Sequence, residues 1–352
     1  LKKLKGKEGI KVFMIKRLYA CVREYRLATW LTPLFILGEA VIECLIPYRI
    51  ANLINNLNDY GVVLESIIKD GLILAALACA SLICGTCAAI TAAKAGSGFA
   101  KNLRHDMYDC IVKYSFANID RFSSSSLVTR MTTDVGYVQM AFMIIIRMAI
   151  RCPLMLIFSI IMAYIMGGTL STMFVIVVPV LAVGLFLVAK NAMPAFRSVF
   201  RKYDKLNESI EENVSAMRAV KSFVREDYEQ EKFTRASEDI RKDFTHAERI
   251  VALNSPLMQL CLYFNMAFVL YIGSKLIIGS NGTYINVGQL SAMLTYGFQI
   301  LSSLMMVAMV CVMLTLSAES AHRIYEVLSE SSSLNNPENP VTEVKNGDID
   351  FS

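Results

Sequence analysis

Six long apolar stretches restrict what this chain can fold into more than any other feature of its sequence. A helix needs about 20 mostly apolar residues to cross a bilayer. Six stretches meet that length, at residues 27–53, 71–93, 140–166, 170–192, 256–278 and 287–316. The charged fraction of 18% is also below the roughly 25% of soluble domains. We therefore expect an all-α membrane protein with six long transmembrane helices.

Basic residues gather on one side of these predicted spans. Long basic segments precede the first span and separate the second span from the third and the fourth from the fifth. Cytoplasmic loops are enriched in Lys and Arg, so we expect both termini in the cytoplasm of a multi-pass protein of the cell membrane, with a bacterial inner membrane as the expected location. The net charge of +5 then reflects topology, and no partnership with nucleic acid is expected.

The two long cytoplasmic connections, at about 94–139 and 191–254, have the composition of helices. In the second, apolar residues recur at helical intervals, and neither Gly nor Pro occurs between Arg197 and Ala252. Such a pattern predicts continuous helix. The spans should therefore extend into the cytoplasm as two helical hairpins, each with a short docking surface for a soluble partner at its tip. Solvated hairpins without a partner are the alternative.

Two pairs of charged residues lie inside the predicted spans. Arg147 and Arg151 are four residues apart in the third span, and Glu39 and Glu43 have the same spacing in the first. A charge in a spanning helix costs at least about 2.5–3.5 kcal/mol and is rarely turned to lipid. We expect these acids and bases to pair in one conformation and to separate in another. Two alternatives stay open: the arginines line a cavity for an anionic substrate or headgroup, or they anchor the helix by snorkelling.

Other candidates for a substrate pathway or gate are aromatic or polar residues within the spans. They are Phe142, Tyr296 and Gln299, and ordinary helix packing is the alternative reading for each. The three histidines are isolated, and most of the nine cysteines lie inside apolar runs without metal-ligand spacing. We therefore expect no metal site and no catalytic residue in this segment.

Several stretches resemble ATP-binding cassette (ABC) exporters over essentially the whole chain. EENVSAMRAVKSFVREDYEQEKF, residues 211–233, resembles their second intracellular loop, and residues 106–139 resemble the first, with its Leu-x-x-Arg-x-x-x-Asp-Val pattern. That pattern has Gly two residues before the Leu, where this chain has Ser125. VKNGDIDFS, residues 344–352, resembles the first strand of a nucleotide-binding domain, and RMAIRCP and YGFQILSSLMM are most similar to the heterodimeric multidrug branch.

The resemblance implies a domain organisation and a set of coupling residues. It implies a cytoplasmic or interfacial elbow helix at 1–26, a six-helix exporter transmembrane domain at 27–330, and a linker with the first strand of a nucleotide-binding domain at 331–352. Helices four and five would be exchanged between two half-transporters, with a heterodimer preferred over a homodimer. The residues implied to dock on nucleotide-binding domains are Ile119, Asp120, Arg121, Phe122 and Ser123 in the first loop, and Met217, Arg218, Ala219, Val220, Lys221 and Phe223 in the second.

The implied function is ATP-driven export of a small amphipathic compound, drug, lipid or peptide by inward–outward alternating access. ATP and magnesium would bind in the nucleotide-binding domain, because these residues contain neither a GxxxxGK[ST] motif nor a Ser-Gly-Gly-Gln signature. We therefore expect a truncated segment or a separately expressed membrane half that binds no cofactor itself. The alternative is an ion-coupled secondary transporter without an ATPase partner, although the inverted repeats typical of that class are not visible.

Overall fold

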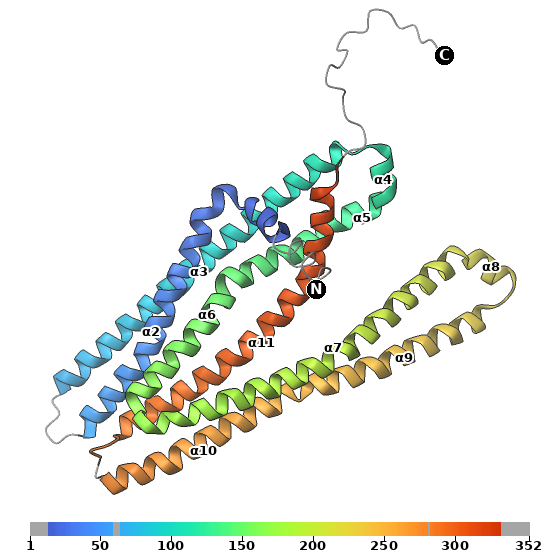
Figure 1. Ribbon diagram of the computed structural model, residues 1–352. Helices are drawn as coiled ribbons and strands as arrows, with labels where there is room; N and C mark the ends of the chain where they lie inside the picture. Colours follow the sequence, from blue (N-terminus) through green and yellow to red (C-terminus); the bar gives the residue numbers. More distant parts are fainter. Residues whose placement is uncertain (1–12, 59–63, 281, 332–352) are drawn as a thin grey trace, which may run out of the picture. The chain divides into compact units, whose positions relative to one another are not determined.

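The computed structural model describes residues 13–58, 64–280 and 282–331, and every regular element within these ranges is helical (Figure 1). Residues 13–20 form a helix that leads through the 3-10 turn Arg23–Tyr25 into the first long helix. The beginning of the predicted elbow helix and the predicted strand at 344–352 lie outside the described residues.

Seven long helices and three short ones account for most of the described chain. The long ones are α2 (Arg26–Asn58), α3 (Leu64–Val112), α6 (Val135–Gly167), α7 (Thr172–Ser215), α9 (Glu226–Ala252), α10 (Asn254–Ser280) and α11 (Val287–Ser329). The short ones are α4 (Phe116–Phe122), α5 (Ser124–Thr129) and α8 (Met217–Ser222). Both predicted hairpins are thus helical, and the short helices α4 and α8 lie at their tips.

Five helical segments of the described chain are long and apolar enough to cross a membrane. One of them, Ser124–Ser215, contains both α6 and α7 within its 92 residues. The 3-10 turn Gly168–Ser171 joins these two helices. Gly168 has a φ of 52°, a left-handed conformation that glycine adopts without the penalty of a side chain. The chain therefore reverses direction between α6 and α7 within a few residues. The short sequence between the third and fourth apolar runs predicts such a tight connection.

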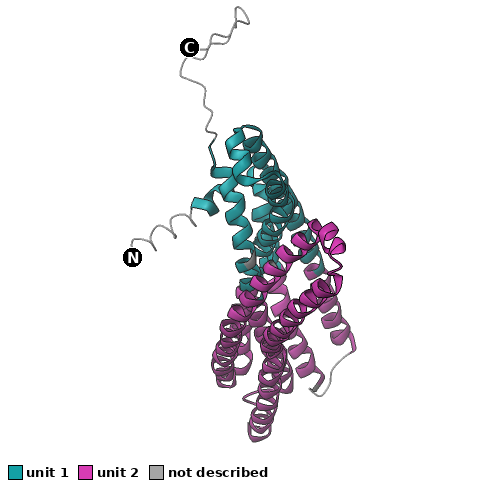
Figure 2. Cartoon of the chain, turned by 90° about the vertical axis from the view of Figure 1, so that its right-hand side faces the viewer, with its two compact units in different colours: residues 1–38, 82–151, 309–352 teal, residues 39–81, 152–308 magenta. Residues whose placement is uncertain are grey.

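The chain forms two compact units, each assembled from separated parts of the sequence (Figure 2). The first unit holds residues 1–38, 82–151 and 309–352, and the second holds residues 39–81 and 152–308. The long helices α2, α3, α6 and α11 contribute residues to both. Each unit has its own apolar core.

In the first unit, the C-terminal half of α3 lies at the centre of the core. Phe99, Leu103 and Met107 are buried on α3 together with Ile324 near the end of α11. The hydroxyl of Thr32 on α2 donates to Thr91 on α3 at 2.9 Å. The C-terminal part of α3 is therefore held by packing and does not depend on helix propensity alone.

In the second unit, the outer half of α11 is the central element. Tyr296, Met293 and Ile300 on α11 are completely buried against Phe174 of α7 and Val269 of α10, among others. Beyond the apolar spans, α7 and α9 continue side by side as the second cytoplasmic hairpin (Figure 1). This hairpin carries α8 at its tip.

Candidate coupling surfaces and substrate pathway

The first loop tip consists of α4 and α5, which meet at a sharp turn. Ser115 caps α4 by accepting the backbone N–H of Asn118 at 3.4 Å, and the Asn118 side chain accepts the N–H of Ser115 at 3.2 Å. Ser123 has a φ of 56° between the two helices and caps α5 through the N–H of Ser126. Ser125, where the exporter pattern has Gly, lies within α5. The sharp turn is therefore at Ser123.

Phe122 anchors this tip from the inside. Its ring is 8% exposed and stacks on Tyr114 with 5.8 Å between ring centroids. The guanidinium carbons of Arg121 and Arg130 lie 5.5 and 5.1 Å from the centroid of the same ring. Of the predicted coupling residues on this loop, Phe122 therefore faces the interior of the first unit.

The other predicted residues of the first tip are more accessible. Asp120, Arg121 and Ser123 are exposed, and Ile119 is half-buried. Phe116, which the sequence did not single out, is 84% exposed on α4. An exposed aromatic ring at the start of this short helix adds apolar area to the surface that the tip presents.

The end of α11 is bonded to the loop through an ion pair whose carboxylate is buried. Arg323 donates from Nε to Oδ2 of Asp134 at 2.7 Å and from a terminal nitrogen to Oδ1, and the Asp134 side chain is 1% exposed. Arg130 donates to the carbonyl of Arg323 at 2.7 Å and to the carboxylate of Glu326 at 2.8 Å. The π-helical turn between Arg130 and Asp134 thus places both side chains against α11.

The last turn of α11 bonds to α4 in a similar way. The Glu330 carboxylate accepts from the Asn118 amide at 2.9 Å and from Arg121 at 2.9 and 3.0 Å. The Tyr114 hydroxyl donates to the carbonyl of Val327 at 2.7 Å. Burial raises the pKa of Tyr114 to about 12, so this donor stays protonated at neutral pH.

We refer to these contacts together as the α11 clasp. Its residues are Arg323 and Glu326 of α11, Glu330 directly after it, and their partners Asp134, Arg130, Asn118 and Arg121. Charge-assisted and bidentate bonds of this kind are stronger and more directional than neutral ones. The clasp therefore favours movement of the end of α11 and the first loop tip as one body.

The second loop tip has a different character. None of the residues of α8 is buried, and Phe223 and Val224 directly after it are 78% and 82% exposed. Val224 turns the chain into α9 with a φ of 51°. The predicted coupling residues Met217, Arg218, Ala219, Lys221 and Phe223 are all exposed, and Val220 is half-buried. This tip therefore has apolar and basic side chains that its own unit leaves exposed.

Comparison with known families identifies the architecture. The family described as "ABC transporter transmembrane region" matches residues 29–318, which is most of the chain. The chain belongs to this family of ABC transporter transmembrane regions. It is accordingly a multi-pass membrane protein.

Relatives of this ABC transmembrane region are found in distant organisms. An uncharacterized ABC transporter ATP-binding protein of Mycobacterium tuberculosis is 29% identical over 275 residues, which are 78% of this chain and 47% of the relative. The uncharacterized ABC transporter ATP-binding protein YfiB of Bacillus subtilis is 26% identical over 333 residues, which are 94% of this chain and 57% of the relative. The chain thus spans about half the length of the curated relatives it matches.

The charged residues predicted for the pathway of this ABC transmembrane region are distributed over its two units. Arg147 and Arg151 are half-buried in the first unit. Glu39 is buried and Glu43 half-buried in the second. Pairing between the acids and the bases stays a prediction. Phe142 stacks on the buried ring of Phe99, with 4.6 Å between centroids.

A polar network joins three helices at the positions predicted for Tyr296 and Gln299. Tyr296 is fully buried, and its hydroxyl donates to the carbonyl of Cys44 on α2 at 2.7 Å. Ser159 on α6 donates to the Gln299 side chain at 3.1 Å and lies 3.8 Å from the thiol of Cys44. Tyr296 therefore has a packing role in this conformation, and Gln299 is the more accessible of the two.

Sequence reasoning missed Asn265, the polar residue in the middle of α10. Asn265 is 3% exposed, and its Oδ1 has no hydrogen-bond partner in the part of the chain that the structure describes. Gly297 on α11 lies directly opposite, because a Cβ at that position would be 2.3 Å from the Asn265 amide nitrogen. A lone Asn within an apolar run was the available signal, since such a residue is seldom turned to lipid.

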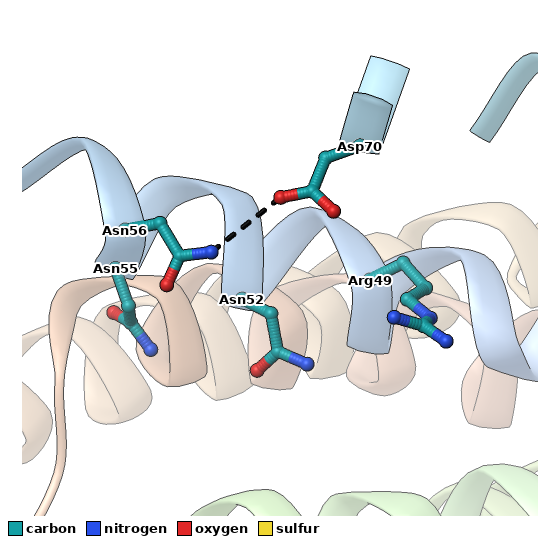
Figure 3. A pocket seen from close by; sticks show the side chains of 5 residues that line it. All are labelled: Arg49, Asn52, Asn55, Asn56 and Asp70. Carbon is teal, nitrogen blue, oxygen red and sulfur yellow. Dashed lines mark hydrogen bonds between the residues drawn. The ribbon is translucent and has the colours of Figure 1, made fainter. Parts of the chain in front are cut away.

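A small polar cavity of about 280 Å³ lies at the outer ends of α2 and α3 (Figure 3). Its lining residues are Arg49, Asn52, Asn55, Asn56 and Asp70. Asn56 donates to the carboxylate of Asp70 at 3.4 Å, and Asn55 accepts the backbone N–H of Gly288 at 2.9 Å. At least two of these polar side chains therefore connect helices of the second unit.

Proposed function

We propose that this chain forms the membrane domain of an ATP-driven exporter, with α2, α3, α6, α7, α10 and α11 as its six spans. ATP and magnesium would bind in nucleotide-binding domains, and their closure would drive inward–outward alternating access. The exported compound would be small and amphipathic, such as a drug, a lipid or a peptide. The names of the relatives as ABC transporter ATP-binding proteins support coupling to ATP.

The α11 clasp is the observation that carries this proposal. In the proposed arrangement, residues 27–330 form the transmembrane domain and residues 331–352 lead from α11 into the nucleotide-binding domain. The first loop tip is bonded to the last turns of α11 through Glu330 and Arg323. A movement that reaches the chain after α11 would therefore be transmitted directly to the first coupling surface.

The second tip supports an intermolecular role. Its exposed ring at Phe223 and the basic Lys221 form a surface that its own unit leaves uncovered. We propose that it docks on the nucleotide-binding domain of a second half-transporter, with the helices α7, α9 and α10 exchanged in the dimer. We further propose that the two half-transporters differ and form a heterodimer in the cell membrane. The termini would lie in the cytoplasm, and residues 1–26 would form the elbow helix.

The deciding experiment measures uptake of the amphipathic dye Hoechst 33342 into inside-out vesicles that contain the whole transporter. We expect uptake to require ATP, and Phe223→Ala to lower it by about tenfold while leaving the melting temperature unchanged, because the ring is 78% exposed. Tyr228→Ala, an exposed aromatic residue on α9 outside the tip, serves as the matched control. Uptake driven by a proton or sodium gradient without ATP would instead establish the secondary transporter.

The two arginines in α6 provide a second test of the pathway. We expect Arg147→Ala and Arg151→Ala to lower dye uptake several-fold at normal expression, because both are half-buried charges in a spanning helix. Lys113→Ala, which removes an exposed charge from the first loop, is the control. Unchanged uptake with normal expression in both arginine variants would assign them to membrane anchoring.

A further inference from the structure

The helix α7 carries a basic stripe where it leaves the membrane. No Asp, Glu, Lys or Arg occurs from residue 172 to residue 189, and the first charges that follow are Lys190, Arg197 and Arg201. Lys190, Pro194, Arg197 and Arg201 are separated by four, three and four residues in turn. They therefore share one face of the helix.

This stripe faces away from the neighbouring helix α9. The opposite side of α7 meets α9 through Phe196, whose ring lies 6.1 Å from that of Phe244, and through Lys202, which pairs with Asp243 at 2.7 Å. Val199 between them is completely buried. Because contact with α9 uses that side, Arg197 and Arg201 remain exposed on the other.

An open groove lies along the stripe. It has a volume of about 540 Å³ and is lined by Pro194, Arg197, Phe200 and Arg201. Phe200 is 54% exposed, so the groove combines an aromatic surface with two cations. Arg201 uses Nε to bond the carbonyl of Arg197 at 3.3 Å, which leaves its terminal N–H groups available. Among the described side chains, neither guanidinium has a carboxylate within ion-pair distance.

The depth of the groove matches the headgroup layer of the cytoplasmic leaflet. A hydrocarbon core about 30 Å thick takes about 20 helical residues, which places its inner boundary on α7 close to Ala192. Arg197 then lies about 8 Å beyond that boundary and Arg201 about 14 Å. Headgroups occupy roughly the first 5–8 Å, and arginine side chains reach back toward them.

We propose that the groove formed by Pro194, Arg197, Phe200 and Arg201 binds the headgroup of an anionic phospholipid from the inner leaflet. The phosphate accepts hydrogen bonds from the two guanidinium groups, whose planar geometry suits phosphate oxygens. The glycerol backbone lies against Phe200 and Pro194, and the acyl chains run along the apolar part of α7. The inner leaflet is rich in anionic lipid, and each arginine near it contributes about a fivefold preference for anionic lipid.

Photocrosslinking of lipid to the groove tests this site in the whole transporter. Phe200 is replaced by p-benzoylphenylalanine, and the protein is placed in nanodiscs of phosphatidylcholine with 10 mol% phosphatidylglycerol. After irradiation, mass spectrometry identifies the lipid attached to the peptide that contains residue 200. We expect phosphatidylglycerol to make up about 70% of the adducts, about seven times its share of the bilayer, because two fivefold preferences combine.

Matched variants separate the groove from general attraction to charge. Arg197→Gln with Arg201→Gln should return the adducts to the bulk lipid ratio, and each single variant should lower the phosphatidylglycerol share of the adducts by about half. Arg235→Gln with Arg241→Gln, which removes two exposed charges from α9 outside the groove, should keep the full enrichment. Size-exclusion chromatography verifies that each variant is folded.

Three results would overturn the proposal. The first is a bulk lipid ratio in the parent protein. The second is crosslinking of residue 200 to protein instead of lipid, which would show that another subunit covers the groove. The third is loss of the enrichment on adding millimolar glycerol 3-phosphate, which would assign the arginines to a soluble anion.

Discussion

Arg323→Ala should destabilise the protein by on the order of 3 kcal/mol, because it leaves the Asp134 carboxylate buried without its counter-ion. The Asp134 side chain is 1% exposed and is bound by two N–H groups of Arg323. The loss also removes one of the contacts that hold the end of α11 to the first loop. We expect the apparent melting temperature of the purified transporter to fall by several degrees, measured by size-exclusion chromatography after heating.

An exposed pair provides the control for this prediction. Arg241 binds Glu238 on α9 through two bonds of 2.7 Å, yet both side chains are largely exposed. Exposed pairs contribute about 0–1 kcal/mol, so Arg241→Ala should change the melting temperature little. Asp134→Asn combined with Arg323→Ala should recover part of the loss, because it removes the buried charge. Equal effects of Arg323→Ala and Arg241→Ala would show that the clasp does not stabilise the fold.

Gly288→Ala should also destabilise the protein, by about 3 kcal/mol. A Cβ on Gly288 would lie 2.0 Å from the backbone oxygen of Ala51, which cannot move without shifting α2. The N–H of Gly288 also donates to Asn55 at 2.9 Å, and displacement of α11 would stretch this bond. We expect a lower melting temperature and reduced expression for this single added methyl group.

Gly279→Ala is the matched control, because it makes the same chemical change without the steric conflict. Nothing lies within 4 Å of a Cβ at Gly279, which is exposed near the end of α10. Alanine favours helix over glycine by about 1 kcal/mol, so this variant should be neutral or slightly stabilising. If Gly288→Ala melts like Gly279→Ala, then α2 and α11 do not approach as closely as the structure indicates.

Local patterns in the sequence were sufficient to predict the helices. The apolar runs predicted the long helices, and the absence of Gly and Pro after Arg197 predicted that α7 and α9 extend beyond the membrane. Membrane spanning depends on the length and polarity of a segment, and helical periodicity depends on neighbours three or four residues apart. Both are properties of contiguous sequence, so they could be read without knowledge of the tertiary structure.

The orientation of individual side chains could be determined only from the tertiary structure. Phe122 and Tyr296 were expected at a docking surface and a pathway, and both are buried. Arg323 and Asp134 are 189 positions apart in the chain, and no periodicity connects them. The sequence alone determined that this is a helical membrane protein with two long helical hairpins. Only the tertiary structure decided which faces of those helices meet, because such contacts depend on packing between segments that are distant in sequence.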